Sequence, residues 1–192
     1  MTTTAIEIAP NSALLVIDVQ KGFDEESFWG PRNNPAAEDN IAALMDAWQT
    51  AGRPVVLVRH ASVQPGSVLA ADHPGYAFKD LVEKRSEGAL VVTKTVNSAF
   101  YGTPDLADWL TAQGIGQLVL VGIQTNMCVE TTARMAGNLG YDVLVPLDAT
   151  HTFDLAGPVG LALTADELAT ATAVNLQGGG FARVVTTADL LS

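Results

Sequence analysis

Short runs of consecutive apolar residues recur along the chain, and glycine, proline or polar residues separate them. Runs of this kind, rich in Val, Ile and Leu, are typical of strands that are buried on both faces. They predict strands at six places, which are residues 13–17, 54–58, 90–92, 118–121, 142–146 and 182–186.

Between these runs, apolar residues recur at helical spacing. The clearest case lies between Pro35 and Gly52, where Ile41, Leu44 and Trp48 form one stripe. Three further helices are predicted: one opening at Thr103, one running on from Thr125, and one from Thr164 to about Leu176. Because strands and helices alternate, we expect an α/β fold with three layers, in which helices cover both faces of a mainly parallel sheet.

Composition and charge argue against several classes of protein. The 192 residues are 48% hydrophobic, which fits one globular domain over residues 1–192 and argues against disorder. The net charge of −11, with only 10 Lys and Arg, disfavours binding to nucleic acid or to anionic membranes. The N-terminus lacks the basic start and apolar run of a secretory signal, and no apolar stretch has the length of a membrane span. We therefore expect a cytoplasmic protein.

The segment from Leu118 to Arg134 contains the only cysteine of the chain. Its composition predicts a strand, a tight turn after Gly122 and then a helix, with Cys128 in or near the first helical turn. There the helix dipole and the unsatisfied N–H groups stabilise a thiolate, so Cys128 is a candidate nucleophile. The alternative is a small buried apolar residue, which is the usual role of a free cysteine.

Two more polar residues follow predicted strands: Asp18 comes after the first strand and Lys94 after the third. Ligands bind beyond the carboxyl ends of the strands in open α/β sheets, so the topology can bring both residues to Cys128. Asp18 would act as the base, Lys94 would hold the thiolate, and N–H groups of the turn would bind an oxyanion. Taken singly, each residue also has a plain structural role as a turn cap, a solvated lysine or a packing residue.

Three segments stand out in order along the chain: LLVIDVQKGF at 14–23, KTVNSAFYGT at 94–103 and GIQTNMCVETTAR at 122–134. Together they resemble the isochorismatase-like cysteine hydrolases, and the resemblance covers nearly the whole chain. It implies an α/β fold with a six-stranded, mainly parallel sheet. It also implies a catalytic triad of Cys128, Asp18 and Lys94.

The same resemblance implies a cis peptide bond between Ile123 and Gln124. This bond would aim the N–H groups of Gln124 and Cys128 at the oxyanion. The resemblance further implies a homo-oligomer, often a dimer or a tetramer, that acts on a small-molecule substrate.

The function we favour is hydrolysis of a C–N bond in a small amide, ureido or lactam-like compound through a thioester on Cys128. A second interpretation is isochorismatase-type hydrolysis of an enol ether, for which Asp18 and Lys94 would suffice. A third is a non-catalytic binding protein on the same fold. A thiol sensor is a fourth, although the chain offers no second cysteine to resolve a disulfide.

We expect no cofactor and no catalytic metal. Nicotinamidases of this superfamily carry metal ligands that begin with Asp-x-His after the second strand, whereas this chain reads Arg59-His60-Ala61 at that place. His60 and His73 without a placed carboxylate make a weak metal site. His60 is expected to be a hydrogen-bonded residue at a strand end.

Substrate contacts are predicted from closeness in sequence to Asp18 or Lys94. Aromatic side chains could wall the pocket, and two amide side chains could donate hydrogen bonds or merely brace loops. The candidates are Gln20, Phe23, Trp29, Asn97, Phe100 and Tyr101. Some of these aromatic residues could equally be ordinary core. Residues 62–88, a long polar stretch, are expected to shape the pocket mouth or a subunit interface.

Overall fold

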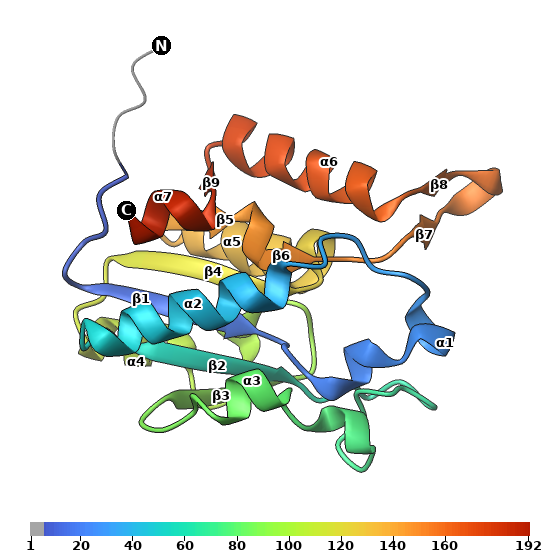
Figure 1. The fold of residues 1–192 in the computed structure, drawn as a ribbon, viewed down its shortest axis with the longest axis horizontal. Helices are drawn as coiled ribbons and strands as arrows, with labels where there is room; N and C mark the ends of the chain where they lie inside the picture. Colours follow the sequence, from blue (N-terminus) through green and yellow to red (C-terminus); the bar gives the residue numbers. More distant parts are fainter. Residues whose placement is uncertain (1–5) are drawn as a thin grey trace.

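The computed structural model describes residues 6–192, which form a parallel sheet between two layers of helices (Figure 1). Six strands follow one another in the order β3-β2-β1-β4-β5-β9, and every pairing among them is parallel. Their bounds are β1 Ser12–Ile17, β2 Val55–His60, β3 Leu90–Lys94, β4 Gln117–Ile123, β5 Asp142–Pro146 and β9 Arg183–Val185. The predicted fold class is confirmed, and a two-residue strand, β6 (Thr150–His151), adds to the end of β4.

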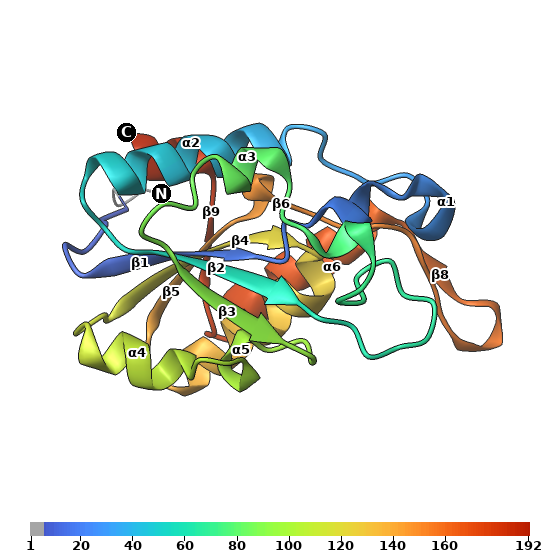
Figure 2. The ribbon, with the colours of Figure 1, turned by 90° about the horizontal axis from the view of Figure 1, so that it is seen from below.

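Helices cover both faces of the sheet (Figure 2). On one face lie α2 (Ala37–Thr50), α3 (Asp80–Glu83) and α7 (Thr187–Leu191). On the other face lie α4 (Leu106–Ala112), α5 (Glu130–Asn138) and α6 (Ala165–Gly178). Between residues 6 and 192, no helix combines the length and the apolar character needed to cross a membrane.

Alternate residues of each strand enter different cores. In β1, Leu14 and Val16 pack under α2 with Trp48, whereas Leu15 and Ile17 pack against the opposite helices. This explains why the strands read as unbroken apolar runs: neither face of the sheet meets water.

Two short elements lie beyond the carboxyl ends of the strands, apart from the body of the sheet (Figures 1 and 2). One is the short helix α1 (Glu26–Trp29), and the other is an antiparallel hairpin formed by β7 (Leu155–Ala156) and β8 (Ala162–Leu163). The apolar runs did not predict either element, because both are short and half-exposed or exposed.

The ends of β1 and β4 approach each other closely. Gly122 has a φ of 127°, and a Cβ at this position would lie 2.0 Å from the carbonyl oxygen of Ile17. Only glycine fits such an approach, so this residue sets how near the two strand ends come. The peptide bond that follows, between Ile123 and Gln124, is cis.

Candidate active site

The carboxyl ends of three strands position the three candidate catalytic residues. Asp18 directly follows β1, Lys94 is the last residue of β3, and Cys128 lies in η4 (Thr125–Val129), the turn between β4 and α5. Cys128 therefore lies in a helical turn that leads into α5, as predicted, and this turn is π-helical. The sheet thus brings together residues that are up to 110 positions apart in the chain.

Lys94 is the centre of the cluster. Its Nζ lies 2.6 Å from Asp18 Oδ2, 3.3 Å from Cys128 Sγ and 3.1 Å from His60 Nδ1. An ammonium group has three N–H donors, so it can donate one hydrogen bond to each of these neighbours. The side chains of Lys94 and Asp18 are both fully buried, which strengthens their interaction because water does not screen it.

His60 was expected only as a hydrogen-bonded residue at a strand end, and the structure places it in the cluster. In the register of β2 with β3 it lies directly beside Lys94. Burial and the neighbouring ammonium of Lys94 lower the pKa of His60, so its ring is neutral and Nδ1 can accept a hydrogen bond from Lys94. The register of neighbouring strand ends was the signal that could have found this residue.

Asp18 keeps one carboxylate oxygen free for chemistry. Oδ2 is held by Lys94, whereas Oδ1 is buried and has no hydrogen-bond partner among the described residues. A buried, unpaired carboxylate oxygen is costly and marks a place where a proton is accepted or a ligand is bound. The ligand atoms of Asp18, His60 and Cys128 all lie within 4.8 Å of one another, so the thiol is close to the carboxylate of Asp18.

The surroundings of Cys128 keep its thiol protonated. Burial raises the pKa of Cys128 well above its ordinary value, the carboxylate of Asp18 raises it further, and Lys94 opposes both effects. The resting state is therefore a neutral thiol beside a carboxylate rather than a preformed thiolate. A reaction at Cys128 must move the proton to a neighbouring base as the sulfur attacks.

The cluster does not suit a metal ion. Asp18, His60 and Cys128 have ligand atoms close enough to share one. However, the ammonium nitrogen of Lys94 already lies within 3.3 Å of an atom of each and supplies the positive charge of the cluster. A divalent ion there would have to displace a buried lysine and leave its charge unpaired.

A cavity of about 290 Å³ opens onto this cluster. Phe23, Phe28 and Trp29 form an aromatic wall, with ring centroids of neighbouring pairs 4.8–5.0 Å apart. Besides the cluster residues Asp18, His60 and Cys128, the polar part of the lining is uncharged and consists of Ser62, Gln64, Ser67, Asn97 and Gln124. Residues 62, 64, 67 and 69 come from the long stretch between β2 and β3, part of which thus borders the cavity.

The residues predicted to contact substrate fall into two groups. Phe23, Trp29 and Asn97 line the cavity, and Asn97 Oδ1 lies 4.0 Å from Cys128 Sγ. Phe100 instead packs in the core and stacks on a tyrosine, and Tyr101 is exposed.

The remaining candidate, Gln20, is buried outside the cavity lining. Its side chain donates to the carbonyl groups of His60 and Tyr76 and accepts from the N–H of His60. It therefore braces the end of β2, where His60 lies.

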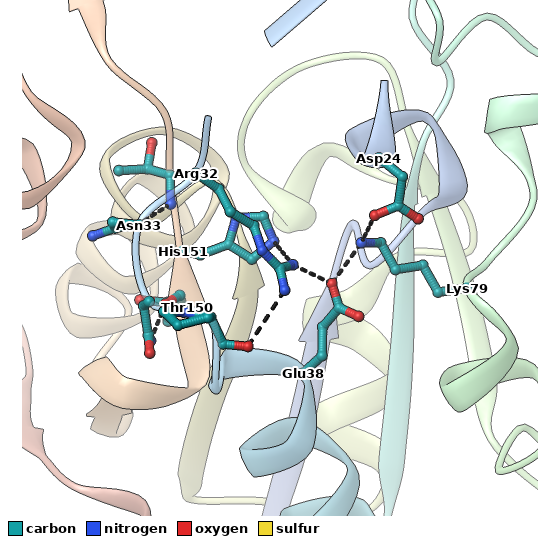
Figure 3. A network of polar contacts seen from close by, with 10 residues as sticks. Asp24, Arg32, Asn33, Glu38, Lys79, Thr150 and His151 are labelled. Carbon is teal, nitrogen blue, oxygen red and sulfur yellow. Dashed lines mark hydrogen bonds and ion pairs between the residues drawn. The ribbon is translucent and has the colours of Figure 1, made fainter. Parts of the chain in front are cut away.

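A network of polar contacts connects the segments on either side of α1 with α2 and β6 (Figure 3). Lys79 is almost completely buried, and its Nζ lies 2.5 Å from Asp24 Oδ1 and 2.6 Å from Glu38 Oε1. Arg32 pairs with Glu38 and lies 3.2 Å from Nε2 of His151. Burial, Arg32 and Lys79 lower the pKa of His151 to about 3, so the ring is neutral and Nε2 accepts.

The segment around β6 in turn supports the turn that carries the candidate oxyanion hole. β6 pairs with the last two residues of β4, immediately before Gln124. Thr125 Oγ1 donates to Thr150 Oγ1 at 2.8 Å, and Thr152 Oγ1 donates to Asn126 Oδ1 at 2.5 Å. These bonds hold both residues that follow Gln124.

Comparisons with known proteins agree with this fold. The family model of the isochorismatase domain matches residues 12–189. An uncharacterized isochorismatase family protein, YrdC of Bacillus subtilis, is 41% identical over 74% of this chain and 75% of that protein. Streptothricin hydrolase of Streptomyces noursei is 36% identical over 84% of this chain, which spans 62% of that protein. The structure of an isochorismatase family protein of Chromobacterium violaceum has a TM-score of 0.91 and 41% identity, with 99% of this chain and 97% of that chain covered.

Proposed function

Since the chain belongs to the isochorismatase family, we propose that it is a cysteine hydrolase that cleaves a C–N bond in a small amide, ureido or lactam-like substrate. The observation that carries the proposal is the carboxylate of Asp18: one of its oxygens lies within 4.8 Å of the neutral thiol of Cys128, Oδ2 is held by Lys94, and Oδ1 is buried with no hydrogen-bond partner among the described residues. The name of one relative, streptothricin hydrolase, agrees with a hydrolytic reaction.

In the first half-reaction, Asp18 takes the proton of Cys128 as the sulfur attacks the carbonyl carbon of the substrate. Lys94 stabilises the negative charge that develops on the sulfur. The N–H groups of Gln124 and Cys128 then bind the oxyanion of the tetrahedral intermediate. When the C–N bond breaks, Asp18 gives its proton to the departing nitrogen, and a thioester remains.

In the second half-reaction, water attacks the thioester carbonyl. Asp18 is again a carboxylate and takes a proton from this water. The C–S bond breaks, the thiol recovers the proton, and the acid product leaves. Both halves use the same base and the same oxyanion site, so one cluster serves the whole cycle.

The neutral ring of His60 fits this scheme. It accepts one hydrogen bond from Lys94, and the other two N–H groups of the ammonium can donate to Asp18 and Cys128. His60 acts here as a positioning residue, because it reaches the reacting sulfur only through the ammonium group.

A panel of small amides tests the proposal, with released ammonia or amine as the readout. We expect Cys128→Ala and Cys128→Ser to lower turnover by about 10³-fold or more while the unfolding midpoint stays near that of the native protein. Full turnover by Cys128→Ala would exclude the thioester mechanism. If Cys128→Ala also hydrolysed an enol ether, the reaction at Asp18 and Lys94 alone would become the better explanation.

A further inference from the structure

The cavity walls carry no unpaired charge. Among the described residues that line the cavity, only Asp18, His60 and Cys128 are ionisable. Asp18 is paired with Lys94, the ring of His60 is neutral, and the thiol of Cys128 is protonated. The aromatic and amide or hydroxyl side chains that complete the lining add no charge.

Among residues 6–192, no lysine or arginine lines the cavity, so none is placed there to receive an anion. The chain has 10 of these residues, and Lys94 alone contacts the reacting groups, with an acceptor for each of its three protons. Arg32 and Lys79 are paired with Glu38 in the network of Figure 3, and neither lines the cavity. Arg59 stacks over the ring of Tyr76, with 4.4 Å between its guanidinium carbon and the ring centroid.

The charge balance bears directly on the substrate. A carboxylate that enters this cavity would lose its water without gaining a cationic partner, and such burial costs several kcal/mol or more. The unpaired oxygen of Asp18 would repel it as well. An uncharged planar group, in contrast, finds in the lining both aromatic rings, such as those of Phe23 and Trp29, and neutral hydrogen-bonding groups, such as Asn97.

We propose that the site takes uncharged amides with a planar apolar body and excludes amides that carry a carboxylate. The inference rests on the proposed function, because it names the substrate class of the same site. It also argues against the enol-ether interpretation, since isochorismate carries carboxylates.

The single cysteine allows a test that needs no known substrate. Iodoacetamide and iodoacetate differ mainly in charge, and intact mass spectrometry counts each adduct. We divide the rate constant for iodoacetamide by the rate constant for iodoacetate. We expect this ratio to be about tenfold higher on the native chain than on the urea-unfolded chain, which is 1.4 kcal/mol of discrimination against the charged reagent. An equal or smaller native ratio, with both reagents reacting, would overturn the uncharged-substrate inference and leave the nucleophile intact. Failure of both reagents on the native chain at every pH would overturn the proposed function with it.

A gain of charge provides the converse test. Gln64 lines the cavity and is exposed, so Gln64→Arg adds a cation at the mouth without touching the buried cluster. We expect Gln64→Arg to move the reagent ratio toward iodoacetate, whereas the uncharged control Gln64→Met leaves it unchanged. A shift of the same size in both variants would show that size rather than charge sets the ratio, and would overturn the inference.

Turnover gives an independent readout with benzamide and 4-carbamoylbenzoate. These compounds share a planar ring and a primary amide and differ by one carboxylate. We expect kcat/KM to be at least about 100-fold higher for benzamide, as a loss of 2.7 kcal/mol would produce. Equal values, or a preference for the carboxylate, would overturn the inference while supporting amide hydrolysis. Hydrolysis of neither compound, together with a thiol that fails to react, would count against both proposals.

Discussion

The ammonium of Lys94 and the carboxylate of Asp18 lie 2.6 Å apart, and neither side chain has any solvent-exposed surface. A buried ion pair stabilises a fold only modestly, because the desolvation of both charges offsets most of their attraction. Removal of only one partner is strongly destabilising, because the remaining buried charge keeps its desolvation cost without the attraction. The pair therefore links the proposed reaction to the stability of the carboxyl end of the sheet.

We predict that Lys94→Met lowers the free energy of unfolding by about 3–5 kcal/mol, because Asp18 is left as an unpaired buried charge. The double variant Asp18→Asn/Lys94→Met should recover most of this loss, since both charges are then gone. Urea denaturation of the two variants measures the difference. A double variant as unstable as Lys94→Met would show that packing, rather than charge, accounts for the loss.

The variant Asp18→Asn distinguishes the reactivity of the Cys128 thiol from the proposed role of Asp18 as a base. The carboxylate of Asp18 raises the pKa of Cys128, so its removal should lower that pKa and speed alkylation by iodoacetamide near pH 7–8. Amide turnover should nevertheless fall by about 10²–10⁴-fold, because no base remains to move the protons. Alkylation that slows in step with turnover would mean that Asp18 activates the thiol in the resting state.

The bond between Thr125 and Thr150 ties β6 to the candidate oxyanion turn. Thr150→Val leaves the buried hydroxyl of Thr125 without its acceptor, which costs about 1–3 kcal/mol, and we expect kcat to fall more than KM changes. Thr172→Val is the control, because it removes a buried threonine hydroxyl that donates to Glu130 in the helical layer instead. If the two variants lost kcat equally at equal stability, the turn would have no special dependence on β6.

The stability of the protein should depend on His151 in acid. The pKa of this ring is about 3 when folded and near 6.5 when unfolded, so between these values only the unfolded chain binds the proton. Stability contributed by the neutral ring is therefore present above pH 6.5 and is lost as the pH falls toward 3. In His151→Gln, the slope of unfolding free energy against pH between 4 and 6 should be smaller by about 1.4 kcal/mol per pH unit. Parallel slopes for the two proteins would contradict a neutral buried ring.

Much of the site was predictable because it lies at strand ends. Apolar runs located β1, β3 and β4, and the parallel topology then placed Asp18, Lys94 and Cys128 at one edge of the sheet. The same rule extends to His60, which ends β2 directly beside Lys94. The sequence alone does not predict His60 as part of the site, because a lone histidine at a strand end more often has only a structural role.

Closeness in sequence was a poorer guide to the cavity wall. Phe100 and Tyr101 lie near Lys94 along the chain, but the short helix η3 (Ala99–Tyr101) turns one side chain into the core and the other into solvent. Phe28 lines the cavity from α1, an element that leaves no periodic pattern because it has only four residues. Side-chain direction in such short elements depends on tertiary packing rather than on local sequence.

Asp18 has a φ of 54°, a left-handed conformation that aspartate and asparagine tolerate better than most residues. Asparagine tolerates this backbone as aspartate does, and at Asp18 it would remove the proposed base. In the genetic code, one nucleotide change converts an aspartate codon into an asparagine codon. A lineage carrying this fold can thus lose hydrolysis in one mutational step, with little strain at that backbone, and keep the cavity as a binding pocket.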